Sequence, residues 1–562
     1  MAKMLGWLKK YSMLIFVVLL AGFLRFYQLG ANPPSLDWDE ASLGYNAWSL
    51  LQTGHDEFGN FWPLTIRSFG DYKPPLYTYL LVPTLKLFGR TEFAIRLPSA
   101  LAGTFTVLIT YFLVKEFFNH SNHFNHSAIP LLSSFLLAIS PWHLQFSRIA
   151  FEANLGLFFF IAGMWQLVRW LNGISTLSIL YASLFFSLSL MSYHSLRLVV
   201  PLMIIFILFI YRGDLLNKIK TQKPVFGIST ILAILTIVTI LYTIFIQKVG
   251  QARFSETSIF TITKLLDIPK NRIDRFNGNF LDRFANYRYL IYAKQYLSGY
   301  LDHYNLRFWL LDGDRIDRHR TPDVGLLYFW EFPFLMIGLW YVMRRSLGLM
   351  GPFDFAQGKK SAQILIFWFF LAPTASAATG GTPSAVRSLV FLPTFQILTA
   401  IGIVQVIKNI EKKQLILKRL FGLLLTAYCL LFTFELSHYF HQYYTHSSLE
   451  YANAWQYGYK QMVERVMIEK DRYNKIIVTT SYDQPYIYVL WYGNYDPSSW
   501  MNNGEFNKGF DKFRFLKIDW QEMKNSPRSL IIGEAKEMGG APISWVIAYP
   551  DGTPAFLAAE TP

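Results

Sequence analysis

Long apolar runs recur from one end of this 562-residue chain to the other, and they constrain the fold more than any other feature. About 20 apolar residues in a helix cross the hydrocarbon core of a bilayer. A lipid-exposed segment must satisfy its own backbone hydrogen bonds, which favours helices for uninterrupted apolar runs. Only 16% of the residues are charged, against roughly 25% in soluble domains. The sequence therefore predicts an α-helical polytopic membrane protein.

We predict about eleven transmembrane helices from these runs. The predicted segments are Met13–Leu24, Leu97–Phe118, Ala128–Ile139, Leu155–Leu171, Leu177–Met191, Leu198–Tyr211, Phe226–Ile246, Leu326–Met343, Ile364–Ala378, Leu389–Ile407 and Leu420–Phe440. Lys and Arg residues gather in the short connections 212–223, 344–360 and 408–419. Because short cytoplasmic loops are rich in Lys and Arg, this predicts a cytoplasmic N-terminus and an extracytoplasmic C-terminus. The net charge of +15 is thus explained by membrane topology rather than by nucleic-acid binding.

Three hydrophilic segments are predicted to lie outside the membrane. Two are outer loops of the membrane domain 1–441, at about 30–96 and 247–324, and the third is the tail 442–562. The tail has a helical stretch at 449–469 and short β-rich runs near 476–480, 530–532 and 545–548, with a turn at 549–553. This pattern predicts a small extracytoplasmic α/β domain.

The first outer loop places Asp37, Asp39 and Glu40 within four positions, close to a membrane span. Asp37 and Glu40 have the spacing of a capping box, which only starts a helix. Asp39 fits that structural role less well. A carboxylate here can also act as a general base that accepts the proton of an attacking hydroxyl. Both interpretations of the cluster stay open from the residues alone.

Several basic residues are candidates for binding a phosphate at the outer surface. Lys73 precedes two prolines that hold the chain extended, whereas Arg197 and Arg387 each stand at the outer end of a span. Each of the three can equally be an interfacial anchor. Arg148 and Glu152 are spaced to pair on one helix face or to position a substrate.

Nucleotide and metal signatures do not account for the polar residues. The sequence contains neither a Gly-rich nucleotide-binding loop nor a cysteine framework, since Cys429 is the only cysteine. The spaced histidines His120, His123 and His126 are interpreted as a polar linker rather than a metal site. The acidic stretch 312–317 lacks the full spacing of a calcium loop. We expect no required cofactor, although a divalent cation is conceivable.

Three segments resemble the C-type (GT-C) glycosyltransferase superfamily, in its bacterial branch related to dolichyl-phosphate-mannose–protein mannosyltransferases and lipid A aminoarabinose transferases. They are Asp37–Ala41 (DWDEA), Asp71–Leu76 (DYKPPL) and Phe93–Ser99 (FAIRLPS). The stretch from Arg148 to Glu152 and the position of Arg387 are also similar. The resemblance covers the first 200 residues well and the tail poorly.

The resemblance implies a GT-C fold and inverting transfer of a sugar from a polyprenyl-phosphate donor to an acceptor hydroxyl on the outer face of the membrane. The family's acidic residue corresponds to Asp39, with Glu40 beside it, and its basic position corresponds to Lys73. Glu152 stands where the family often has Asp. Arg148 and Arg387 lie in stretches that resemble the family, and together with Arg197 they are further predicted ligands of the lipid phosphate. The acceptor is a protein, lipid or glycan.

Two other classes of function stay open. A transporter or flippase of lipid-linked glycans would place charges deep within spans or in broken helices, whereas most charges here lie in outer loops. A scaffold whose tail binds an outer partner has no need for carboxylates at the lipid surface.

Overall fold

The computed structural model describes residues 2–118, 124–245, 257–261, 264–275, 280–349, 358–411, 415–503 and 509–562. The chain forms two compact units. The helical unit comprises Met1–Phe26, Ser99–Ser147 and Glu152–Tyr439, and the sheet unit comprises Tyr27–Pro98, Arg148–Phe151 and Phe440–Pro562. The first outer loop thus belongs to the same compact unit as the tail, although the sequence analysis had grouped that loop with the membrane domain.

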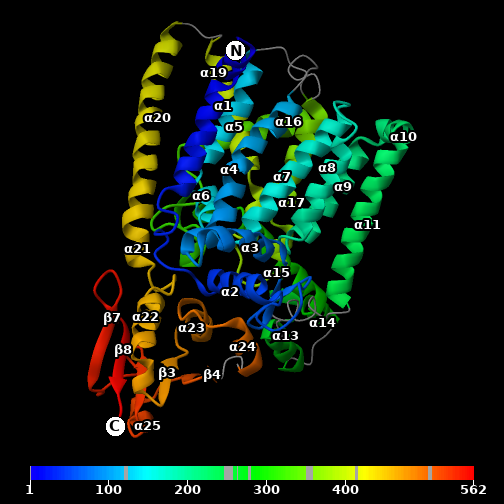
Figure 1. The fold of residues 1–562 in the computed structure, drawn as a ribbon. Helices are drawn as coiled ribbons and strands as arrows, with labels where there is room; N and C mark the ends of the chain where they lie inside the picture. Colours follow the sequence, from blue (N-terminus) through cyan, green and yellow to red (C-terminus); the bar gives the residue numbers. More distant parts are fainter. Residues whose placement is uncertain are drawn as a thin grey trace. The chain divides into compact units, whose positions relative to one another are not determined.

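The helical unit is built from apolar helices and the short helices that join them (Figure 1). They are α1 (Ala2–Phe26), α4 (Glu92–Phe117, from Ser99 onward), α5 (Phe124–Ile139), α6 (Pro141–Ser147), α7 (Glu152–Leu171), α8 (Ser178–Leu190), α9 (Leu196–Ile210), α10 (Arg212–Thr221), α11 (Lys223–Phe245), η1 (Ile259–Thr261), α13 (Lys264–Arg275), α14 (Phe280–Ala285), α15 (Arg288–Asp302), η2 (Arg307–Leu311), η3 (Asp317–His319), α16 (Glu331–Ser346), α17 (Gly358–Leu371), α18 (Thr374–Ala377), η5 (Leu389–Phe391), α19 (Thr394–Glu411) and α20 (Leu415–His441, to Tyr439).

Four helical segments of the described chain are long and apolar enough to cross a membrane, and up to six if each bent pair counts as one span. The four are Glu92–Phe117, Glu152–Leu171, Lys223–Phe245 and Leu389–Ile410. The bent pairs are α5 with α6 and α9 with α10. These findings confirm a mostly helical chain with helices apolar enough to span a membrane, whereas the number of about eleven spans stays a prediction.

Glycines allow two helices of the helical unit to approach backbone to backbone. A β-carbon on Gly338 of α16 would lie 1.9 Å from the carbonyl oxygen of Leu398 in α19. A β-carbon on Gly402 of α19 would lie 1.9 Å from the carbonyl oxygen of Phe334 in α16. Any larger side chain at either position would force the helices apart, as at other small-residue crossings in membranes.

The sheet unit contains a six-stranded mixed sheet in the order β4-β5-β3-β6-β8-β7. The strands β5, β3 and β6 are parallel, whereas β4 pairs antiparallel to β5, and β8 pairs antiparallel to both β6 and β7. The strands are β1 (Ile66–Ser68), β2 (Asp71–Lys73), β3 (Lys475–Thr479), β4 (Gly509–Phe510), β5 (Phe513–Leu516), β6 (Ser529–Gly533), β7 (Ile543–Ala548) and β8 (Pro554–Glu560). The helices are α2 (Trp38–Thr53), α3 (Leu76–Phe88), η6 (Gln442–His446), α21 (Ser447–Glu450), α22 (Tyr459–Glu469), η7 (Lys470–Arg472), α23 (Pro485–Tyr492), α24 (Pro497–Asn503) and α25 (Trp520–Met523).

The predicted α/β tail is confirmed, with one difference at its first helix. The amide of Tyr549 donates to the carbonyl of Thr553 at 2.8 Å, which closes the predicted turn between β7 and β8. The predicted helix 449–469 is split into α21 and α22. Gly458 has φ of 104°, a left-handed conformation that interrupts a helix.

Buried polar contacts hold the first outer loop to the tail within the sheet unit. The side chain of Asn46 in α2 donates to the Glu57 carboxylate at 3.1 Å, and the hydroxyl of Tyr486 in α23 donates to it at 2.8 Å. The indole N–H of Trp500 in α24 donates to the carbonyl of Glu57 at 3.1 Å. Glu57 therefore joins α2 to two helices of the tail, α23 and α24, whose contacting residues are 429 and 443 positions away in the sequence.

Candidate functional site

Asp39 and Lys73, two of the sequence-predicted residues of the first outer loop, meet in the sheet unit. The Nζ atom of Lys73 lies 2.6 Å from Oδ1 of Asp39. The Lys73 side chain is 11% exposed and the Asp39 side chain 26% exposed. A partly exposed carboxylate held by one lysine can reach a substrate while its orientation stays fixed. We refer to these two residues as the acid–lysine pair.

Local sequence explains how each residue of the acid–lysine pair is held in position. Asp37 is the N-cap of α2, and its side chain accepts from the amide of Glu40 at 2.7 Å in a complete capping box. The capping box places Asp39 in the first turn of α2, near the positive end of the helix dipole. Lys73 ends β2, directly before the two prolines at which α3 begins.

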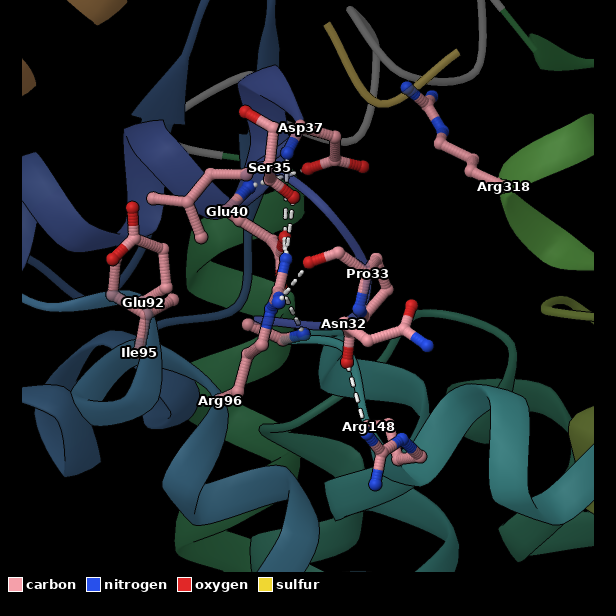
Figure 2. A network of polar contacts seen from close by, with 12 residues as sticks. Asn32, Pro33, Ser35, Asp37, Glu40, Glu92, Ile95, Arg96, Arg148 and Arg318 are labelled. Atoms are coloured by element: carbon pink, nitrogen blue, oxygen red, sulfur yellow. Dashed lines mark hydrogen bonds and ion pairs between the residues drawn. The ribbon is translucent and has the colours of Figure 1, made fainter. Parts of the chain in front are cut away.

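Glu40 forms a buried ion pair with Arg96 (Figure 2). Both side chains have no exposed surface, and Nε and Nη2 of Arg96 each donate to one Glu40 oxygen at 3.0 Å. Arg96 also donates to the carbonyls of Leu29, Pro33 and Ser35. The amide of Ala150 donates to Glu40 at 2.9 Å. Glu40 is therefore bound on all sides by protein.

Arg148 is buried by contacts within the sheet unit (Figure 2). It donates to the carbonyl of Asn32 at 3.0 Å and to the hydroxyl of Tyr443 at 2.9 Å. Its guanidinium lies over the ring of Tyr444 as well, 5.5 Å from the ring centroid. Glu152 begins α7 of the helical unit and is 7% exposed.

Arg197 and Arg387 line one cavity of about 290 Å³ in the helical unit. Arg197 lies in the first turn of α9, and Arg387 lies between α18 and η5. The cavity is also lined by Tyr193, His194, Ser195, Leu198, Ile244, Thr257, Ala375 and Thr379. The sequence predicts these two arginines at the outer ends of spans, and the structure places both on the wall of one cavity. Two guanidinium groups beside a helix N-terminus are well suited to bind an anion.

Polar side chains hold the segment 376–388, which carries Arg387 into this cavity. Ring nitrogen Nε2 of His303 accepts from the amide of Ser384, and Nδ1 donates to the carbonyl of Gly299 at 2.7 Å. The carboxylate of Asp314 accepts from the amide of Ala385 at 2.6 Å. Arg387 itself donates to the carbonyl of Gly380 at 2.6 Å. We call His303 and Asp314 the loop clamp.

The charge states of the loop clamp follow from these contacts. Burial lowers the pKa of His303 to about 4, which keeps the ring neutral so that one nitrogen can accept. The pKa of Asp314 is lowered, because hydrogen bonds to its charged form outweigh the effect of burial. Both groups therefore hold the charge state that their hydrogen bonds require at neutral pH.

The part of the chain that the structure describes contains no cluster of side chains suited to bind a metal ion. No group of three or more His, Cys, Asp or Glu side chains is placed there to hold an ion. In the acidic stretch 312–317, Asp312 pairs with Arg307 and Asp317 pairs with Arg320. The side chains of His120, His123 and His126 lie outside the described residues.

We predict that the stability of the sheet unit depends on pH because of Glu57. Burial raises the pKa of Glu57 from its ordinary value of 4.5 to about 8, and Asp56 adds to this rise. The folded protein keeps the proton that the unfolded chain releases, so stability should fall as pH rises from about 4.5 to about 8. We expect Glu57→Gln to flatten this dependence in unfolding midpoints measured across that range. Glu522→Gln, an exposed control, should leave the dependence unchanged, and a flat wild-type profile would contradict the prediction.

Sequence reasoning missed the loop clamp and the structural role of Arg96. His303 and Asp314 contact residues about 70 to 80 positions away in the chain, and no local pattern indicates such contacts. Arg96 lies in a segment that carries the family resemblance, but its partner Glu40 is 56 residues away. The capping box was the one local signal, and it placed Asp37 and Glu40 correctly.

Comparisons with known proteins agree with the fold. Residues 72–242 match the family model described as dolichyl-phosphate-mannose-protein mannosyltransferase. The structure is similar to ArnT from Cupriavidus metallidurans bound to undecaprenyl phosphate, with a TM-score of 0.52, 10% identity and 98% of each chain covered. No curated protein matches the sequence.

A second similar structure is the oligosaccharyltransferase AglB from Archaeoglobus fulgidus, in complex with an inhibitory peptide and a dolichol-phosphate. The TM-score is 0.50 at 15% identity, and the match covers 86% of this chain. This chain spans 64% of the length of that protein. At these identities the two similarities establish the fold.

Proposed function

The chain has the fold of the C-type membrane glycosyltransferases, and from this premise we propose that it transfers a sugar from a polyprenyl-phosphate donor to an acceptor hydroxyl. The observation that carries the proposal is the cavity lined by Arg197 and Arg387, because it offers two cations to a phosphate. The cavity also has apolar walls at Leu198 and Ile244, which suit the lipid part of such a donor.

The acid–lysine pair supplies the base. Asp39 accepts the proton of the acceptor hydroxyl as the hydroxyl oxygen attacks the anomeric carbon of the sugar. The bond from that carbon to the phosphate oxygen breaks, and its electron pair leaves with the polyprenyl phosphate. Attack opposite the leaving group inverts the anomeric configuration. Lys73 orients Asp39 through their contact at 2.6 Å, and the family resemblance keeps Lys73 as a candidate ligand of the donor phosphate.

The other acidic and basic residues have supporting roles in this proposal. Glu40 positions the first turn of α2, since its oxygens are bound by Arg96 and by the amide of Ala150. Arg148 holds the segment around Asn32. We keep Glu152 as a candidate catalytic residue on the basis of family resemblance alone.

We further propose that the protein is a multi-pass membrane protein with a cytoplasmic N-terminus and an extracytoplasmic sheet unit. Helices apolar enough to span a membrane support the first part. The second part rests on the positions of Lys and Arg in the short loops. The acceptor is a protein, a lipid or a glycan.

Transfer and transport can be distinguished in one reconstituted system. Proteoliposomes are loaded with polyprenyl phosphate bearing a radiolabelled sugar, without any nucleotide sugar, and a panel of hydroxyl acceptors is added. The proposal predicts that label leaves the lipid and becomes covalently attached to an acceptor or to water. Label that crosses the bilayer while still joined to the lipid, with no cleavage, would instead support the transporter class.

Arg197 and Arg387 should contribute separately to donor binding. We expect Arg197→Gln and Arg387→Gln each to weaken binding of polyprenyl phosphate by about 10- to 100-fold, because each removes a charge-assisted hydrogen bond worth about 1.5–3 kcal/mol. Binding is measured by equilibrium titration in detergent. Arg344→Gln changes an exposed arginine in the last turn of α16, which does not line this cavity, and should bind as wild type does. Unchanged affinity in both cavity variants would remove the cavity from the proposal.

A further inference from the structure

One face of α15 (Arg288–Asp302) is fixed to the helical unit by tyrosine hydroxyls. The hydroxyl of Tyr296 donates to the carbonyl of Thr374, and that of Tyr300 donates to the carbonyl of Phe370 at 2.6 Å. Tyr304, just after the helix, donates to the carbonyl of Phe369 at 3.2 Å. Carbonyls at the C-terminal end of a helix have no partner within that helix. The three tyrosines therefore secure α15 to the end of α17 and to the first residue of α18.

A second face of α15, about 100° around the helix from Tyr296 and Tyr300, is apolar and exposed. Leu290, Leu297 and Leu301 are 41%, 56% and 56% exposed. At about 100° per residue these three positions lie on one side of the helix. The preceding helix α14 exposes Phe280 at 79% and Phe284 at 60%. We call these five side chains the α14–α15 apolar face, and such a patch is unusual on a surface that meets water.

The position of this segment in the unit indicates what covers the face. It follows α11, a candidate membrane span, and lies at the end of the unit where α11 finishes (Figure 1). Arg283, Arg288 and Lys294 are exposed on the same two helices. Apolar and aromatic side chains beside cations match the boundary between the acyl chains and the phosphates of a bilayer.

We propose that the α14–α15 apolar face lies in the membrane interface, with its leucines and phenylalanines among the acyl chains and its cations at the headgroup phosphates. The partner is the bilayer itself. α15 leads directly to His303 of the loop clamp, so the bilayer surface would also support the segment that carries Arg387. The proposal does not depend on the reaction that the protein catalyses.

Spin labels at single cysteines test this contact. Cys429 is the one native cysteine and is exposed on α20, so Cys429→Ser provides a background without thiols. Labels are then attached at Leu290→Cys, Leu297→Cys or Leu301→Cys in the full chain, reconstituted in phosphatidylcholine and phosphatidylglycerol vesicles. Collision with oxygen and with a water-soluble nickel chelate is compared at each site. Leu235→Cys in α11 is the lipid reference, and the exposed Arg315→Cys is the water reference.

The proposal predicts that oxygen collides with the α15 labels more often than the nickel chelate does, as at the lipid reference. Arg288→Gln with Lys294→Gln should reduce the oxygen preference in vesicles that contain phosphatidylglycerol. Labels that meet the chelate as readily as the water reference would overturn the proposal. Labels shielded from both reagents would also overturn it, because the face would then be covered by protein.

Discussion

Asp39→Asn is expected to lower sugar transfer by about 10²- to 10⁴-fold, because it removes the general base and preserves the side-chain shape. The amide oxygen of the variant can still accept from Lys73, so α2 and the hairpin of β1 and β2 should remain in place. Transfer is measured as sugar moved from polyprenyl phosphate to an acceptor at saturating donor. Binding of polyprenyl phosphate is measured in parallel and should be close to that of wild type.

Asp71→Asn is the matched control for this prediction. Asp71 lies on the same hairpin and its carboxylate accepts from the amide of Tyr72. The same change of charge in the same loop should leave transfer within a few-fold of wild type. If both variants lost transfer activity to the same extent, the effect would come from the changed charge of the loop, and Asp39 would not be the general base.

Arg96→Met is expected to destabilise the protein by about 3–5 kcal/mol, because it leaves the buried charge of Glu40 without its partner. Arg96 also makes three hydrogen bonds to backbone carbonyls, at 2.6 to 3.2 Å, that methionine cannot replace. The free energy of unfolding is measured by denaturant titration in detergent. The double variant Arg96→Met with Glu40→Gln should recover part of the loss, since no unpaired charge remains buried.

A second arginine–glutamate pair in the sheet unit provides the control for burial. Arg472 and Glu560 lie 3.4 Å apart with side chains 60% and 39% exposed. Exposed pairs contribute about 0–1 kcal/mol, so Arg472→Met should have a small effect. A loss for Arg96→Met as small as that for Arg472→Met would contradict the structural role assigned to the buried pair.

Features set by local sequence could be predicted, as α2 illustrates. The spacing of Asp37 and Glu40 predicted a capping box, which is confirmed at the start of the helix. The turn between β7 and β8 was predicted for the same reason, because its residues determine its backbone. The mostly helical fold could also be predicted from the sequence, because long apolar runs indicate helices that can span a bilayer.

Features that depend on distant partners could not be predicted. No local pattern shows that Lys73 lies 2.6 Å from Asp39 or that His303 contacts Ser384. The sequence also grouped the first outer loop with the membrane helices, whereas buried contacts such as Tyr486 to Glu57 join that loop to the tail. These contacts join residues 34, 81 and 429 positions apart, beyond the reach of periodicity or spacing.

The most direct test of the central claim is a single-turnover reaction with polyprenyl phosphate that carries a sugar of known anomeric configuration, without nucleotide sugars. Free polyprenyl phosphate and the glycosylated acceptor are quantified in the same samples, and the anomeric configuration of the product is determined. The account predicts equal amounts of the two products, an inverted configuration and a rate about 10²- to 10⁴-fold lower with Asp39→Asn. Retained configuration, or full turnover by Asp39→Asn, would contradict it.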